Sequence, residues 1–151
     1  MMRAFWTTEA QRKKGGHRED FMEYPHQELT GKIIGAAIAV HEALRPGLDE
    51  KLYERALCVE FAEQGIHFEQ QPKYEVNYKG KFLGHLIPDL VVENAVIVDA
   101  KCVDAFNDVH TAQIVGYLNI TGLDIGLLLN FKSWPLGKRR IIRPGFKPDS
   151  L

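Results

Sequence analysis

Two aspartates and a lysine stand close together in the sequence, in a pattern suited to chemistry on phosphate esters. Asp89 follows Pro88, Asp99 comes ten residues later, and Lys101 lies two positions beyond it. Two carboxylates that meet on an apolar surface repel each other, and a divalent cation such as Mg²⁺ removes that conflict. The cation lowers the pKa of a bound water, and a nearby ammonium neutralises charge on phosphate. The three residues therefore indicate a Mg²⁺ (or Mn²⁺) site.

Whether these side chains converge depends on the register of the strands that carry them. Asp99 and Lys101 share one face of a strand, because side chains two positions apart point the same way. A two-residue turn at Glu93-Asn94 would place Asp89 opposite Val98, on the other face. A three-residue connection or a bulge would place Asp89 opposite Asp99. The catalytic interpretation therefore predicts one of these two features.

A simpler interpretation of the same residues stays open. Asp89 would begin a strand after a proline turn, and Asp99 would form a surface ion pair with Lys101. Against it, residues 95–103 are otherwise apolar, and buried charges need partners or a metal.

Three segments have the apolar spacing of helices, and they cover about residues 29–44, 49–64 and 109–121. Thr30 is expected to cap the first helix, and Asn107 or Asp108 the third. Gly65 is expected to end the second helix in the left-handed conformation. The second helix has an expected core-facing stripe, formed by Leu52, Tyr53, Ala56, Val59 and Ala62.

Strand patterns fill most of the remaining chain. They are expected at residues 67–71, 73–78, 81–87, 90–93, 95–103, 124–131 and 138–143. Lys79-Gly80 is expected to form a tight turn. The nearly continuous apolar strands indicate a sheet covered on both faces, and the last strand is expected to be more exposed.

Length and composition suggest one ordinary domain. The chain has 151 residues, and its two cysteines form neither a disulfide framework nor a zinc spacing. No apolar run reaches about 18 residues, so we expect no membrane span, no signal peptide and a cytoplasmic location. Residues 1–26 are polar and are interpreted as a flexible N-terminal arm before a domain at 27–151.

Charge is unevenly distributed along the chain. Residues 21–131 carry eight basic and sixteen acidic side chains. Residues 132–147 carry six basic and no acidic side chains: Lys132, Lys138, Arg139, Arg140, Arg143 and Lys147. This basic strip is able to contact phosphates, and it is equally compatible with a solvated edge.

The motifs resemble those of a known enzyme superfamily. Asp89, Asp99 and Lys101, with Pro88 in front, resemble the signature of the PD-(D/E)XK nuclease superfamily, with Asp in the Asp-or-Glu slot. Residues 47–53, Gly-Leu-Asp-Glu-Lys-Leu-Tyr, resemble the motif that names the GxxExxY proteins, a group within that superfamily. The similarity runs over about residues 29–142.

The resemblance implies an α/β fold with a restriction-endonuclease-like core (αβββαβ), a mixed β-sheet flanked by helices in a single domain. It also implies Mg²⁺-dependent hydrolysis of phosphodiester bonds in DNA or RNA. Gln113 and Tyr117, four positions apart on one helix face, are similar to the Gln-x-x-x-Tyr element of RecB-like nucleases. Carried over by position, the implied metal ligands are Glu50, Asp89 and Asp99, and the implied catalytic helpers are Lys101, Gln113 and Tyr117.

Each supporting residue also has a structural interpretation. Glu50 suits the first turn of a helix, where the helix dipole favours an acid. Tyr53 suits packing, as aromatic residues on helices usually do, and Gln113 suits a hydrogen bond to the end of a strand. The spacing of His110 gives no argument for metal binding.

Three hypotheses follow. The first is a metal-dependent nuclease. The second is a catalytically inactive module that keeps the nuclease fold and binds nucleic acid or a protein partner, and the acidic balance of residues 21–131 favours it. The third is a structural or oligomeric domain, such as a homodimer, with an incidental ion pair.

Overall fold

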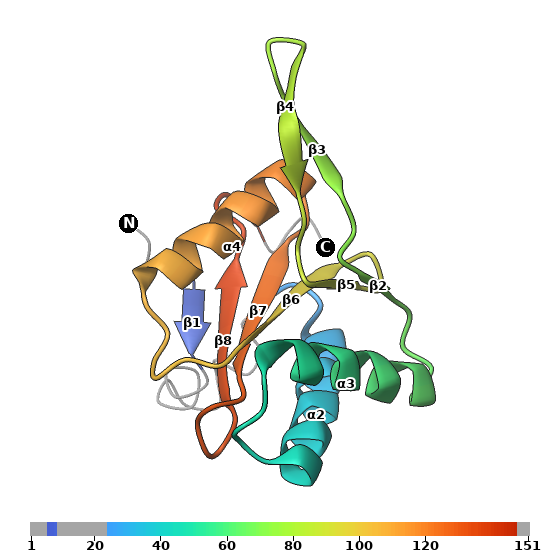
Figure 1. Cartoon of the computed structure of the whole chain (residues 1–151). Coiled ribbons are helices and arrows are strands. Elements are labelled where there is room, and N and C mark those ends of the chain that lie inside the picture. The colour runs from blue at the N-terminus through green and yellow to red at the C-terminus, as the bar shows by residue number, and fades with distance from the viewer. Residues whose placement is uncertain (1–5, 9–23, 148–151) are drawn as a thin grey trace.

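The computed structural model describes residues 6–8 and 24–147 (Figure 1). Within these residues, six strands form one sheet in the order β1-β8-β7-β6-β5-β2. Strands β6 and β7 run parallel and the other neighbours run antiparallel, so the sheet is mixed as expected. The strands are β1 (Trp6–Thr8), β2 (Phe68–Gln70), β5 (Leu90–Val92), β6 (Val96–Lys101), β7 (Ile125–Asn130) and β8 (Gly137–Ile142).

Helices cover both faces of this sheet. On one face, Val96, Val98 and Ala100 of β6 join the core formed by α2 (Gln27–Leu44) and α3 (Glu50–Glu63). On the other face, Ile97 packs in a second core with the apolar side of α4 (Asp108–Thr121). Residues 97, 99 and 101 alternate with the first set, so Asp99 and Lys101 lie on the α4 face. The expected α/β class, with a mixed sheet flanked by helices, is confirmed.

The side of α3 that faces the core differs from the apolar stripe that the sequence predicts. Tyr53, Leu57 and Phe61 are fully buried, whereas Leu52 and Val59 are 43% and 63% exposed. The helix carries two apolar stripes, and the one with two aromatic rings buries more area against the sheet.

The ends of the helices agree with the sequence except at α2. Gly65 follows α3 with φ of 72°, and Asn107 accepts a hydrogen bond from the backbone of His110 as the cap of α4. Thr30 was expected to cap the first helix, but α2 begins earlier, and the Thr30 hydroxyl donates to the carbonyl of Gln27 at 3.0 Å.

Two strands stand outside the main sheet. Strands β3 (Tyr74–Tyr78) and β4 (Lys81–Leu86) pair only with each other, and Figure 1 shows their hairpin extending away from the sheet and helices. Lys79 and Gly80 have φ of 49° and 77° and form the tight turn that the sequence predicts.

The last strand is less exposed than expected. Strand β8 lies between β7 and β1, and its Arg140 and Ile141 are buried. The predicted arm at residues 1–26 contributes β1 to this sheet edge, and Tyr24 joins the core. Residues 1–5 and 9–23 of that arm lie outside the described residues. No helix in the described part of the chain is long and apolar enough to cross a membrane.

Candidate active site

Asp89 and Asp99 come together because the connection between β5 and β6 has three residues. Leu90 pairs with Val98, so Asp89, directly before β5, lies opposite Asp99. The connection consists of residues 93–95. Glu93 and Asn94 have positive φ angles of 51° and 52°, and Ala95 follows them before Val96 pairs with Val92. The predicted three-residue connection is confirmed, and the alternative two-residue register is not adopted.

The two carboxyl groups interact directly in a largely buried place. Asp99 is 5% exposed, and an oxygen of Asp89 accepts a hydrogen bond from the amide of Ala100 at 3.3 Å. Burial, a hydrogen bond to Asp99 and the charge of Asp99 raise the pKa of Asp89 to about 8. Asp89 therefore holds a proton at neutral pH without a cation, which relieves the repulsion between the two carboxylates.

Lys101 completes a buried cluster with the two aspartates. Its Nζ lies 3.2 Å from Oδ2 of Asp99. Burial lowers the pKa of Lys101, but the charges of Asp99, Glu50 and Asp89 outweigh that effect and the net shift is upward. Lys101 is therefore an ammonium at neutral pH, able to stabilise negative charge but not to act as a base. The ion pair with Asp99 exists, but it is buried rather than on the surface.

Glu50 reaches the end of β6 from the first turn of α3. Its Oε2 accepts a hydrogen bond from the amide of Cys102 at 2.9 Å, one residue past Lys101. Among the described residues, no three His, Cys, Asp or Glu side chains are close enough together to hold one ion. The donor set that does converge is Asp89 and Asp99. Two carboxylates suit Mg²⁺, which keeps several waters and uses one or two protein carboxylates.

The other distinctive residue of segment 47–53 has a structural role. The hydroxyl of Tyr53 donates to the carbonyl of Arg45 and accepts from the amide of Leu48 at 3.1 Å. Its ring stacks on Phe131 with centroids 4.6 Å apart. Tyr53 thus fixes the α2–α3 connection and, with it, the position at which Glu50 begins its helix.

Helix α4 brings His110 and Tyr117 within electrostatic range of the cluster, and Gln113 contacts Tyr117. Gln113 donates to the hydroxyl of Tyr117 at 3.2 Å. Burial and the charges of Asp99 and Asp89 raise the pKa of Tyr117, so its hydroxyl lies within electrostatic range of both carboxylates. His110, for which the sequence gives no argument for metal binding, also lies within electrostatic range: burial, and then the charges of Lys101 and an arginine on β8, lower its pKa. Its helical spacing of three and seven from Gln113 and Tyr117 is the sequence signal for this position.

A residue missed by sequence reasoning supports the cluster from α3. Glu54 is buried, and its Oε2 accepts from the side chains of Gln70 at 2.8 Å and Gln71 at 3.3 Å. The amide of Gln71 in turn donates to the carbonyl of Asp89 at 2.8 Å. This chain of hydrogen bonds ties α3 to the strand end that carries Asp89. A glutamate on a helix is ordinarily solvated, so neither its residue type nor its position indicates this role.

The basic strip at residues 132–147 is not one open surface. Lys132 pairs with Asp104 at 2.5 Å, and Arg143 pairs with Asp124 at 2.9 Å. Arg140 is buried with its guanidinium over the ring of Tyr24. Much of this positive charge is therefore used within the fold.

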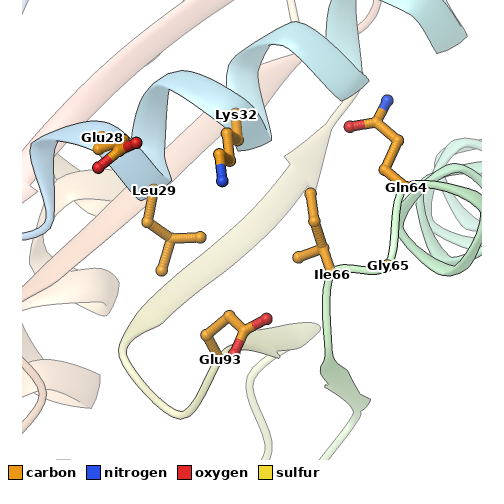
Figure 2. A pocket seen from close by; sticks show the side chains of 7 residues that line it. All are labelled: Glu28, Leu29, Lys32, Gln64, Gly65, Ile66 and Glu93. Atoms are coloured by element: carbon orange, nitrogen blue, oxygen red, sulfur yellow. The ribbon is translucent and has the colours of Figure 1, made fainter.

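A hollow of about 440 Å³ lies away from the aspartates (Figure 2). It is open and lies between the start of α2, the end of α3 and the β5–β6 connection. Its lining residues are Glu28, Leu29, Lys32, Gln64, Gly65, Ile66 and Glu93. Glu93 is at the opposite end of β5 from Asp89, so this hollow is no part of the carboxylate cluster.

Comparisons with known proteins identify the family of this chain. Residues 27–143 match the family model described as the PD-(D/E)XK nuclease superfamily. No curated protein sequence matches the chain. Among solved structures, the crystal structure of SSO0001 is similar with a TM-score of 0.45 and 13% identity, and the match covers 92% of this chain and 65% of that one. The chain thus spans a little under two thirds of that protein's length. Because the family match covers most of the chain, the protein belongs to the PD-(D/E)XK nuclease superfamily.

Proposed function

We propose that the protein is a divalent-metal-dependent nuclease that hydrolyses phosphodiester bonds in DNA or RNA. Its superfamily supports a nuclease-type function in general terms. The observation that carries the proposal is the convergence of Asp89, Asp99 and Lys101 at one buried point. A buried pair of carboxyl groups, one of which holds a proton, is a costly arrangement for stability alone, and it becomes useful when a cation replaces the proton.

The roles follow from the charges of the side chains. Asp89 and Asp99 would hold Mg²⁺ or Mn²⁺, which supplies an activated water and stabilises charge on the phosphate. Lys101 remains protonated and donates to the oxygens on which negative charge develops. Gln113 and Tyr117, which contact each other on α4, would act as donors that orient a phosphate or Lys101.

Glu50 is assigned to the same site as a third predicted ligand, directly or through water. Its present hydrogen bond to the amide of Cys102 would then be shared or exchanged when an ion binds. The finer assignment to the GxxExxY proteins rests on this residue together with Gly47 and Tyr53, and it is part of the proposal.

The test is direct cleavage of plasmid DNA and of single-stranded DNA and RNA, with Mg²⁺ or Mn²⁺ and with a chelator. We expect Asp99→Asn and Lys101→Ala to lower cleavage at least a hundredfold, because each removes charge stabilisation needed at the phosphate. Lys32→Ala, a lysine in the hollow of Figure 2, is the matched control and should cleave like the wild type.

Circular dichroism and melting temperature would establish that the variants fold. Equal cleavage by the wild type, both site variants and the control would remove the proposal. Nucleic-acid binding by the wild type without cleavage in either metal would favour the inactive binding module instead.

A further inference from the structure

The β3–β4 hairpin combines exposed apolar rings with positive charge. Tyr78, Phe82 and Leu83 are 61%, 57% and 63% exposed. Residues 72–87 carry three lysines and one glutamate, although the surrounding residues 21–131 carry twice as many acidic as basic side chains. Exposed aromatic rings beside lysines are the combination by which proteins hold unpaired nucleotides, since rings stack on bases and lysines pair with phosphates.

One face of the hairpin leads outward from the core. Tyr74, Val76 and Tyr78 alternate onto a common face. Tyr74 packs against the same apolar cluster as Tyr117 of α4, so the face begins at the core beneath α4. It ends at the tip, where Nζ of Lys79 lies 5.4 Å from the centroid of the Tyr78 ring.

The opposite face of the hairpin offers a second ring. Phe82 pairs across the hairpin with Asn77, and its ring meets His85 edge-on with centroids 5.2 Å apart. Lys81 is directly opposite Tyr78 and therefore lies on the Tyr78 face, next to Phe82 in sequence. The tip therefore carries an aromatic residue and a lysine in each strand end: Tyr78 and Lys79 before Gly80, and Lys81 and Phe82 after it.

The base of the hairpin is fixed to the site. Gln71, just before it, donates its amide to the carbonyl of Asp89 and its side chain to the buried Glu54. Strand β4 ends at Leu86, three residues before Asp89. From Tyr74 to Tyr78 the strand advances about 13 Å, roughly the length of four stacked nucleotides.

We propose that this hairpin binds single-stranded nucleic acid, with unpaired bases stacked on Tyr78 and Phe82 and phosphates paired with Lys79 and Lys81, and presents that strand to Asp89 and Asp99. This inference rests on the proposed nuclease function and names its substrate class. A single strand fits better than a duplex because ring stacking needs exposed base faces. A duplex exposes only base edges in its grooves.

Binding is measured by the fluorescence anisotropy of a labelled 20-nucleotide oligothymidylate and of a labelled duplex of equal length, with the full chain and a chelator. The paired change Tyr78→Ala and Phe82→Ala should weaken single-strand binding at least tenfold. Lys79→Ala with Lys81→Ala should lower the slope of log affinity against log salt by about 1.4. Leu52→Ala with Val59→Ala removes exposed apolar side chains from α3 and should leave affinity unchanged.

Two results would overturn the inference: wild-type protein that binds the duplex as tightly as the single strand, or unchanged single-strand affinity in the ring variant. The cleavage assay separates this inference from the proposed function. Hairpin-dependent binding without cleavage in any metal removes the nuclease and keeps the hairpin assignment. Cleavage with the same KM in wild type and ring variant keeps the nuclease and removes the hairpin assignment.

Discussion

The pKa of Asp89 is raised so far by burial and by its contact with Asp99 that Asp89 holds a proton at neutral pH. A cation that enters must displace the proton of Asp89, whose pKa is raised to about 8 by burial and by Asp99. Apparent metal affinity should therefore rise by about tenfold per pH unit below pH 8 and level off above it. Titration calorimetry with Mn²⁺ from pH 6 to 9 measures this directly. A profile that stays flat across this range would show that no proton is released.

The same residue predicts how the metal-free protein responds to pH. Because the folded pKa of Asp89 is raised, its contribution to stability is fully present below the unfolded pKa and is lost as pH rises through 8. In a chelator at pH 9, Asp89→Asn should therefore be more stable than wild type, by about 2 kcal/mol after allowance for solvent screening.

At pH 4 the difference between Asp89→Asn and wild type should nearly vanish, because the wild-type carboxyl is then protonated in the folded state. Thermal unfolding at both pH values measures the change. Asp108→Asn, on the exposed first turn of α4, is the matched control. A wild type that is the more stable of the two at pH 9 would contradict the assignment.

Residue spacing predicted more of this site than residue type did. The ten-residue interval from Asp89 to Asp99 limited the possible registers to two, and the structure adopts the one that brings them together. Glu54 could not be identified in this way, because its role depends on contacts with segments distant in sequence.

Elements are held in place by contacts that the sequence pattern does not reveal. Helix α4 packs closely against β7 at Gly126, where an added Cβ would lie 2.5 Å from Cγ2 of Ile114. Gly126→Ala should therefore push α4 off the sheet and destabilise the fold by about 1–3 kcal/mol. It should also lower cleavage, since α4 carries Gln113 and Tyr117.

A glycine on the same helix provides the control for this substitution. Gly116 is exposed on α4, and nothing lies within 4 Å of an added Cβ. Gly116→Ala should stabilise the helix by up to about 1 kcal/mol. Thermal melts of the two variants should shift in opposite directions, and shifts of the same sign would show that α4 does not depend on close approach at Gly126.

Local sequence patterns predicted where the helices and strands lie. They did not always predict which side of an element is buried. Strands β5 to β7 lie where continuous apolar runs predicted them. Helix α3 lies where predicted, but the choice between its two stripes was made by what it packs against, including Phe131 on Tyr53. The spacing of apolar residues in a helix does not indicate which distant residue the helix will pack against.

Strand pairing across the whole molecule was the least predictable feature. Strand β1 pairs with β8 across more than 130 residues of sequence, and the β3–β4 hairpin leaves the sheet although its residues are typical of strands. Both outcomes depend on which strand edges of the sheet each segment pairs with, and local sequence patterns do not indicate that.

The position of the hairpin outside the sheet predicts that the fold survives without it. Tyr74 and Leu86 lie directly opposite each other, so residues 75–85 can be replaced by Asn-Gly with the register intact. None of the removed side chains belongs to either buried core. Unfolding should remain cooperative, and the melting temperature should fall by only a few degrees.

Metal binding distinguishes a preserved site from a merely folded chain in this deletion. Mg²⁺ at a hundred times its dissociation constant should raise the stability of the deletion and of wild type by the same amount, about 2.7 kcal/mol. Asp99→Asn in the deletion background is the control and should show no such increase. Loss of the Mg²⁺ effect in the deletion alone would mean that the hairpin, and not only Gln71 and Glu54, holds Asp89 in place.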